Sequence, residues 1–324
     1  VLNKIINLIL HFLVNFLKKT MIKSNSAFVM RTHKFTEQEK LLYEYASKYF
    51  GESNTFIACN TSKKNIIIPD KYNKVIFNEK KILNDIGLFW HPDWSWRCGD
   101  YWYYALYNSL DKYEYIWLCE PDIYFCNDNS IEFFKPFENN NNDFLALRYG
   151  KARENSYFFP TSKVLEGVPM NCLFGFTRIK TSVIKTLLEK RVELSLSFLN
   201  KKLSPNQYPN DEIFVSTTLK EMNYNISTIE NYTSFDTRLF TADQNEAMIL
   251  EEAKKIKGNF IIHPVLEEEV FLEKKIKRFN SILNNNGNIS QWLRKTLVKT
   301  SNKELKKGLQ KEFIKAFDDY VNKL

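Results

Sequence analysis

The stretch that decides the fold is residues 113–125, which read YEYIWLCEPDIYF. Tyr115 to Cys119 is a short apolar run rich in aromatic and β-branched residues, and this predicts a buried strand. The run stops at Glu120-Pro121-Asp122, so two carboxylates follow the carboxyl end of the strand. Open α/β sheets bind ligands at this edge, and Pro121 stiffens the turn because it fixes φ. Hard cations take oxygen ligands, so Glu120 and Asp122 are candidates to hold Mg²⁺ or Mn²⁺.

Segments on either side of this stretch complete an α/β pattern. Ser26 to Met30 is a strand by composition, and Thr36 to Glu39 is a capping-box start of a helix. A second strand at Thr55 to Cys59 completes a β-α-β unit, of the kind that builds nucleotide-binding half-sheets with crossover helices. Further along we expect strands at 143–147 and 171–178, an irregular loop at 148–163 and a helix at 179–198.

An apolar strand that ends in acid-X-acid resembles the Asp-X-Asp signature of nucleotide-sugar-dependent glycosyltransferases with the GT-A fold. Here Glu120 stands in place of the first Asp, and Pro121 at the centre is not diagnostic. A turn with solvated carboxylates is the alternative interpretation of the triplet. The resemblance covers roughly Ser26 to Leu272. It implies an α/β fold: a single Rossmann-like GT-A domain with a mixed central sheet flanked by helices, plus helical N- and C-terminal extensions.

The resemblance places several donor-binding residues near this edge, Glu120 and Asp122 among them. Arg31 follows the first strand, whose end lies against the nucleotide in GT-A enzymes, so it is a candidate contact of the diphosphate or base. A surface position beside a turn is the alternative. Asn171 and Gly175 lie in a strand similar to the one beneath the donor sugar, and a glycine within a strand often marks the close approach of a ligand.

Residues 90–104 are the densest aromatic stretch of the chain, and Arg97 and Asp100 lie inside it. Asp100 precedes a helix expected over Tyr101–Leu110, so helix capping is its first interpretation and donor binding its second. Arg97 is costly to leave unpaired among aromatic rings, so we expect it to pair with a carboxylate or a donor phosphate. In the GT-A fold the helix before the Asp-X-Asp strand borders the donor pocket, and this segment is similar in placement.

A second acidic pair, Asp211-Glu212, follows Pro209-Asn210. Helix initiation alone explains the pair, because the helix dipole favours acidic residues in the first turn. The pair also resembles one that inverting GT-A enzymes, including core-2 type branching transferases, place at such a helix start. There one carboxylate takes the proton from the attacking hydroxyl of the acceptor. The resemblance implies that Glu212 is the catalytic base, with Asp211 as the second choice.

His263 ends a short apolar run at 259–262 and is followed by Pro264. A histidine at a strand end is usually structural. Many metal-dependent GT-A enzymes nevertheless supply a late-chain histidine as the last ligand beside the Asp-X-Asp motif. The resemblance therefore implies a metal set of Asp122, Glu120 and His263, and imidazole suits Mn²⁺ better than Mg²⁺.

The composition excludes several classes of protein. A hydrophobic content of 44% and an aromatic content of 15% are typical of a globular chain, not a disordered one. Only nine glycines are present, and neither G-x-G-x-x-G nor G-x-x-x-x-G-K-[ST] occurs, so a nucleotide must be held by a metal, side chains and scattered amides. The five cysteines are scattered without a C-x-x-C motif, which predicts reduced thiols in a cytoplasmic protein.

The two ends of the chain differ from its body. Residues 1–20 predict an amphipathic helix, too short and interrupted to span a membrane. Residues 274–324 carry 13 Lys and Arg against 4 Asp and Glu, a net +9 in a chain of +8. We expect a GT-A domain at 21–273 between this helix and a basic helical tail. An apolar helix with a basic patch favours peripheral contact with the inner membrane face, and packing of both helices on the body is the alternative. Sedimentation with anionic vesicles at low and high salt tests the membrane contact.

These features together predict transfer of a sugar from a nucleotide-diphosphate donor to a hydroxyl of a glycan or lipid-linked acceptor. The base implies an inverting reaction, and the metal and arginine offset charge on the leaving group. If neither acid binds a metal, Arg or Lys must neutralise the diphosphate. A nucleotidyltransferase or phosphohydrolase is one alternative, and a non-catalytic carbohydrate- or nucleic-acid-binding module is another. We expect no nucleic-acid partner. The Asn-, Lys- and Ile-rich composition is typical of AT-rich bacterial genomes, where such enzymes build surface polysaccharide.

Overall fold

The computed structural model of the chain describes residues 25–60, 66–77, 79–243, 246–284 and 303–321, together with Trp292 and Thr296. It divides into two compact units, one of Val1–Pro121 with Asp128–Phe235 and one of Asp122–Asn127 with Asp236–Leu324. We call these unit 1 and unit 2. The division differs from the predicted boundary at residue 273, and the N-terminal helix predicted at 1–20 lies outside the described residues.

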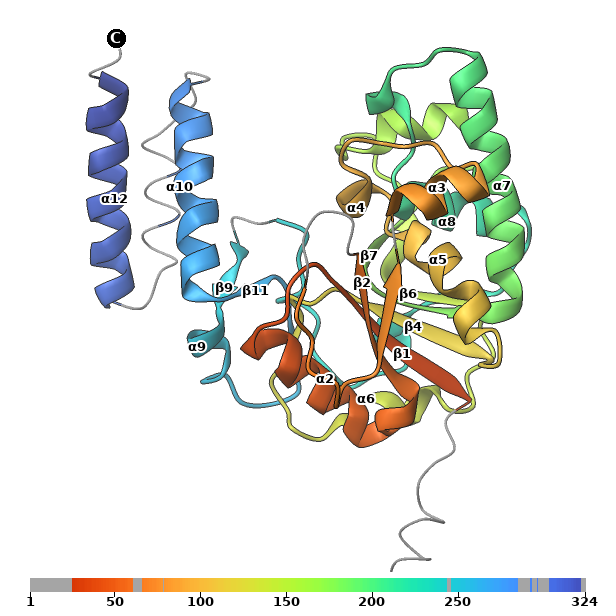
Figure 1. Cartoon of the computed structure of the whole chain (residues 1–324), viewed down its shortest axis with the longest axis horizontal. Coiled ribbons are helices and arrows are strands. Elements are labelled where there is room, and N and C mark those ends of the chain that lie inside the picture. Colours follow the sequence, from red (N-terminus) through yellow and green to blue (C-terminus); the bar gives the residue numbers. More distant parts are fainter. Residues whose placement is uncertain are drawn as a thin grey trace, which may run out of the picture. The chain divides into compact units, whose positions relative to one another are not determined.

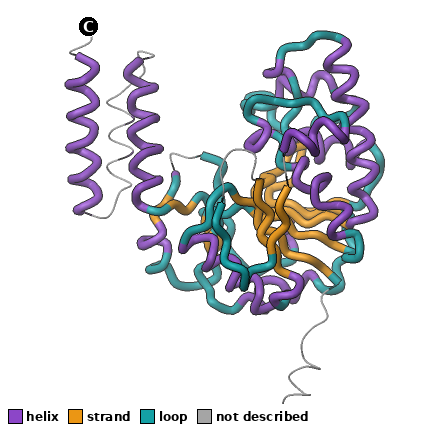
Figure 2. The backbone as a smooth tube through the Cα atoms, viewed as in Figure 1, coloured by secondary structure: helices purple, strands orange, loops and turns teal. Residues whose placement is uncertain are grey.

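A seven-stranded sheet forms the centre of unit 1. Its strands, in spatial order, are β3 (Lys74–Phe77), β2 (Thr55–Asn60), β1 (Ser26–Thr32), β4 (Tyr115–Cys119), β7 (Met170–Lys180), β6 (Phe144–Lys151) and β8 (Ile226–Thr228). Only β7 runs antiparallel to its neighbours, so the sheet is mixed. Figure 2 shows these strands gathered in one layer with helices around them. The predicted α/β fold class is confirmed.

Three helices cover one face of this sheet: α5 (Asp100–Leu110), α7 (Thr181–Asn200) and α8 (Asp211–Glu221) (Figure 1). Alternate residues of the central strands point to this side, among them Val29 of β1 and Ile116 and Leu118 of β4, all buried in one apolar cluster. Leu106 of α5 and Phe214 of α8 close the cluster from above. Burying β4 on both faces explains why its sequence is a continuous apolar run.

The opposite face is packed by aromatic rings beneath α2 (Glu37–Phe50) and α6 (Ser130–Phe134). Trp117 of β4 stacks on Phe176 of β7 at 5.2 Å between ring centroids and meets Phe134 of α6 edge-on at 5.4 Å. Phe28 of β1 contacts Phe134 in the same way at 6.0 Å. The predicted capping box at Thr36 is present at the start of α2. These neighbouring aromatic pairs each add to the stabilisation that burial alone provides.

Short helices join the longer elements: η1 (Glu52–Asn54), α3 (Glu79–Ile86), α4 (Trp94–Arg97), η2 (Lys135–Phe137), η3 (Phe159–Val164), η4 (Pro205–Gln207) and η5 (Ile229–Asn231). The loop predicted at 148–163 is wrong at both ends. Residues 148–151 continue β6, because Gly150 pairs with Asn171 of β7 after a register shift, and η3 occupies the end of the segment. The five cysteines are buried free thiols, as predicted.

Unit 2 contains short strands and two long helices. Its elements are β5 (Tyr124–Phe125), β9 (Met248–Ile249), α9 (Leu250–Ala253), β10 (Ile261–Ile262), β11 (Val265–Leu266), α10 (Glu268–Asn284) and α12 (Lys303–Val321). Strand β5 pairs antiparallel with β10, and β9 pairs parallel with β11. The apolar run predicted to end at His263 contains β10, which stops at Ile262, and β11 begins after Pro264.

The two long helices of unit 2 pack on each other through apolar side chains. Phe279 of α10 lies 4.8 Å from Phe313 of α12, and Leu283 and Leu309 are buried in the same cluster. Ile314 and Phe317 of α12 are exposed instead. Among the described residues, no helix has the length and apolar content that a membrane crossing requires. Peripheral membrane contact stays a prediction.

Candidate functional site

Two strand ends of unit 1 bring the first predicted residues together. Strands β1 and β4 are parallel neighbours with Met30 opposite Cys119, so Arg31 and Glu120 lie side by side where the strands end. The Arg31 guanidinium forms an ion pair with the Glu120 carboxylate and lies 3.5 Å from the carbonyl oxygen of Ser95 in α4. The amide of Glu120 donates to the carbonyl oxygen of Gly175 in β7 (2.8 Å). Arg31, Glu120 and Gly175 therefore lie at the same edge of the sheet, and their contact with a donor stays a prediction.

The second acidic pair starts α8, as predicted from its first-turn position. Asn210 caps the helix by accepting from the amide of Ile213 (3.2 Å). The Asp211 carboxylate accepts from the amide of Gly99 (2.7 Å) and from that of Glu212 (2.8 Å). Glu212 is partly exposed and accepts from the side-chain amide of Asn210 at 3.3 Å.

Burial sets the protonation of Asp211. The side chain is almost fully enclosed, and this raises the pKa of its carboxyl well above the usual range; the nearby charge of Glu212 acts in the same direction. Arg31 and the Gly99 amide oppose the rise in pKa because both stabilise the carboxylate. Two carboxyl groups at one helix start thus have different surroundings, and only Glu212 faces solvent in part.

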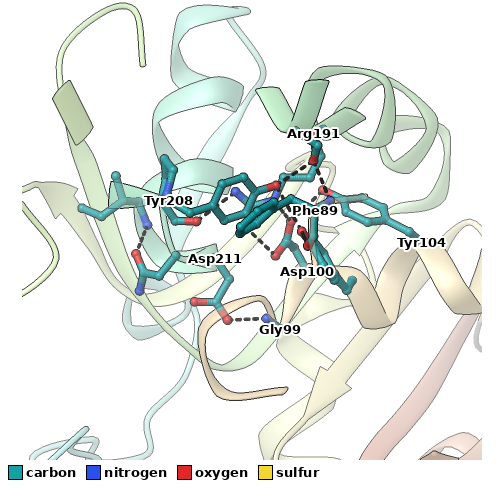
Figure 3. A network of polar contacts seen from close by, with 12 residues as sticks. Phe89, Gly99, Asp100, Tyr104, Arg191, Tyr208 and Asp211 are labelled. Atoms are coloured by element: carbon teal, nitrogen blue, oxygen red, sulfur yellow. Dashed lines mark hydrogen bonds and ion pairs between the residues drawn. The ribbon is translucent and has the colours of Figure 1, made fainter. Parts of the chain in front are cut away.

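The predictions for Asp100 and Arg97 need correction. Gly99, not Asp100, is the N-cap of α5, and the Asp100 carboxylate is buried in an ion pair with Arg191 of α7 while accepting from Tyr104 (Figure 3). It is 1% exposed, so it lies in the core and not on a donor-binding surface. Arg97 pairs with no carboxylate among the described residues. It donates to the carbonyl oxygens of Asn206 and Tyr208 at 3.4 and 3.2 Å.

Asn171 lies in β7 and is partly buried, as the strand prediction requires. Its backbone pairs with Gly150, and a contact with a donor stays a prediction.

In unit 2, Asp122 and His263 lie beside each other. Nε2 of His263 is 3.3 Å from Oδ1 of Asp122, and the amide of Val265 donates to the Asp122 carbonyl (2.7 Å). Nδ1 of His263 lies 2.7 Å from the carbonyl oxygen of Thr241. Because a carbonyl oxygen only accepts, Nδ1 carries a proton in that contact, and Nε2 is the ring atom that faces Asp122. Metal-binding histidines typically make such a contact to a carbonyl oxygen from the ring nitrogen that does not bind the metal. Asp122 and His263 therefore fit a divalent ion.

Three side chains of unit 1 closely approach Gly99, and we expect Gly99→Ala to be damaging. An added Cβ would lie 2.5 Å from Nη1 of Arg31, 2.5 Å from Oδ2 of Asp211 and 3.0 Å from Cδ1 of Phe174. Relieving these overlaps should cost about 1–3 kcal/mol of unfolding free energy and displace both functional groups. Thermal melts and turnover measure the two effects. Gly150→Ala is the control, since nothing lies within 4 Å of its added methyl. Equal behaviour of the two variants would contradict the close approach.

The sequence did not point to Arg191, Tyr208 or the Gly99 amide. Their hydrogen-bond partners are distant in the chain. The Gly99 amide and the Tyr208 hydroxyl bond to residues more than 100 positions away, and Arg191 pairs with Asp100, 91 positions away. The Thr241 carbonyl that orients His263 was also missed, because a backbone acceptor has no sequence signal.

The comparisons with known proteins give only distant structural likenesses. No protein-family model and no curated protein sequence matches the chain. Its structure is similar to the mannose-1-phosphate geranyltransferase from Thermus thermophilus, with a TM-score of 0.34 and 11% identity over 71% of this chain and 82% of that one. It is also similar to the mannosyltransferase Ktr4p from S. cerevisiae, with a TM-score of 0.34 and 11% identity over 64% of this chain and 68% of that one. Likenesses of this size do not decide the function.

Proposed function

We propose that this chain is a metal-assisted glycosyltransferase that moves a sugar from a nucleoside-diphosphate donor to a hydroxyl of a glycan or glycolipid acceptor. The observation that carries the proposal is the pair of Asp122 and His263. The Thr241 carbonyl oxygen accepts from Nδ1 of His263, so Nε2 is the ring atom that faces the Asp122 carboxylate, 3.3 Å from Oδ1. A cation between Nε2 and the carboxylate would take one ligand bond from each.

The proposed ion is Mn²⁺, with Mg²⁺ as the alternative, because imidazole and carboxylate together suit Mn²⁺. Glu120 precedes Asp122 by two residues in the chain and is the proposed third ligand. When bound, the ion would offset the charge that develops on the diphosphate as the glycosidic bond breaks. Arg31 holds the Glu120 carboxylate through their ion pair and adds a further positive charge at the end of β4.

Glu212 is the proposed base of an inverting reaction. Its carboxylate is partly exposed, and Asn210 donates to it at 3.3 Å, so a hydroxyl of an acceptor can approach it from solvent. Proton removal by this carboxylate as the hydroxyl attacks the anomeric carbon would leave the proton on Glu212 and the sugar on the acceptor oxygen. Asp211 has both oxygens engaged by amides, which favours Glu212 over Asp211 for this role.

A panel of nucleoside-diphosphate sugars tests the proposal. With Mn²⁺ present and water as the acceptor, slow hydrolysis of one donor should release free sugar and a nucleoside diphosphate, and EDTA should stop it. Release of a nucleoside monophosphate or of pyrophosphate would instead indicate phosphate-ester or nucleotidyl transfer chemistry. Absence of any turnover across the panel, with or without metal, would leave the non-catalytic binding module as the better account.

A further inference from the structure

A buried arginine in unit 1 connects the two chain segments that meet at Asp211. Arg191 of α7 is fully buried and forms a two-point ion pair with Asp100: Nε lies 2.9 Å from Oδ2, and Nη2 donates to Oδ1 at 3.1 Å. Its remaining Nη1 donates to the carbonyl oxygen of Pro209 at 2.9 Å. One guanidinium therefore holds residues from two segments at once.

The same two segments are joined by the hydrogen bond between the Gly99 amide and the Asp211 carboxylate. Asp100 is the neighbour of Gly99, whose amide donates to the Asp211 carboxylate at 2.7 Å. Pro209 lies two residues before Asp211 and directly before the cap residue Asn210. Figure 3 shows this network, with Arg191, Asp100 and Tyr208 on one side and the bond between Gly99 and Asp211 beside it.

Rings pack around the guanidinium and restrict its position. Its central carbon lies 4.1 Å from the ring centroid of Phe214 in α8 and 4.7 Å from that of Tyr208. The Tyr208 hydroxyl is itself held by Ser195 of α7 at 2.9 Å and by Tyr101 of α5 at 3.1 Å. A planar fork of five donors can make these directed bonds together, whereas a lysine ammonium acts as a point charge.

We propose that Arg191 is a positioning residue for the acceptor base: by clamping Asp100 and Pro209 it holds the Gly99 amide against Asp211 and thereby fixes the first turn of α8, in which Glu212 lies. This inference rests on the proposed function for its catalytic half. The clamp itself concerns only the distance between two segments and is measurable without turnover.

Arg191→Lys tests the clamp, because it keeps the positive charge and removes the fork. The matched control is Arg178→Lys, since Arg178 of β7 is also almost fully buried but donates to carbonyl oxygens of Phe137, Asn140 and Asn142. Arg178 lies near the other end of the central strands, opposite Trp117 of β4. Both variants should lose stability, so thermal melts give the baseline for comparison.

Amide hydrogen exchange gives the first readout. Peptides that cover residues 97–101 and 208–213 should exchange at least about 10-fold faster in Arg191→Lys than in the wild type, because local opening loses its main restraint. The same peptides in Arg178→Lys should exchange at the wild-type rate. If Arg191→Lys does not fold, Asp100→Asn provides the second variant, since it removes the partner charge of the clamp and nearly preserves its shape.

Turnover gives the second readout. We expect Arg191→Lys to lower kcat by at least about 10-fold with KM for the donor unchanged, because displacing a catalytic group by about 1 Å is costly to the rate. Arg178→Lys should keep kcat. Unchanged exchange at 97–101 in Arg191→Lys would overturn the clamp, and faster exchange with an unchanged kcat would overturn its catalytic role. If the wild type turns over no donor, the proposed function fails, and the exchange experiment still decides whether the clamp exists.

Discussion

Asp122→Asn is expected to abolish metal-dependent turnover of the donor while the chain remains folded. The substitution removes the negative charge opposite Nε2 of His263, which lies 3.3 Å away. Mutating a residue that only hydrogen-bonds a metal ligand typically lowers metal affinity or activity by about 10–100-fold. Loss of a ligand itself should therefore lower turnover by at least about 100-fold. The backbone bond from Val265 to the Asp122 carbonyl does not involve the side chain, and it should hold the turn in place.

Calorimetric titration with Mn²⁺ measures the metal affinity of the Asp122→Asn variant directly. Asp243→Asn is the matched control, because Asp243 is an exposed aspartate of the same unit and loses the same formal charge. The control should bind Mn²⁺ as the wild type does. If Asp122→Asn retains near-normal turnover that still requires metal, Asp122 is not a ligand. If the wild type itself turns over the donor without metal, arginine or lysine must neutralise the diphosphate in place of the metal.

The sequence predicted those parts of the fold that neighbouring residues determine. The strand at Tyr115–Cys119 is apolar because the sheet buries it on both faces, and composition alone records this. The capping box at Thr36 and the Asn210 cap of α8 are satisfied within four residues of the chain, so their patterns are local. The register of β1 against β4 then placed Arg31 beside Glu120, because parallel neighbours end at the same edge.

Predictions failed where a distant partner decides the role of a side chain. The sequence predicts Asp100 as a helix cap, yet it is the first residue of α5, and its carboxylate pairs with an arginine 91 positions away. Arg97 was expected to pair with a carboxylate or a donor phosphate. Among the described residues it donates to carbonyl oxygens of the loop before Asp211, and a phosphate contact stays a prediction. No sequence pattern marks the division of the chain after Pro121. Segment Asp122–Asn127 belongs to unit 2 because its strand β5 pairs with the distant strand β10.

Glu212→Gln is expected to reduce kcat by about 100-fold or more, the usual scale for losing a general base, with donor affinity almost unchanged. Glutamine keeps the length of the side chain and an oxygen that Asn210 can still bond, so α8 should start at the same residue. The first turn loses one favourable charge, which costs about 0.3–1 kcal/mol and leaves the fold intact. Steady-state kinetics with the donor identified by the panel, together with nucleoside-diphosphate titrations, separate kcat from donor binding.

Asp211→Asn is the informative partner of that variant, because it changes the neighbouring carboxyl group in the same way. The Asp211 oxygens accept from the Gly99 and Glu212 amides, and asparagine has one acceptor oxygen where two are in use. We therefore expect lower stability from Asp211→Asn and a smaller fall in kcat than from Glu212→Gln. A larger fall would exchange the two roles and make the buried carboxylate the base, in which case its raised pKa would confine activity to higher pH, where it is ionised. If neither substitution changes kcat, proton removal at this helix start is not part of the reaction, and the inverting mechanism loses its support.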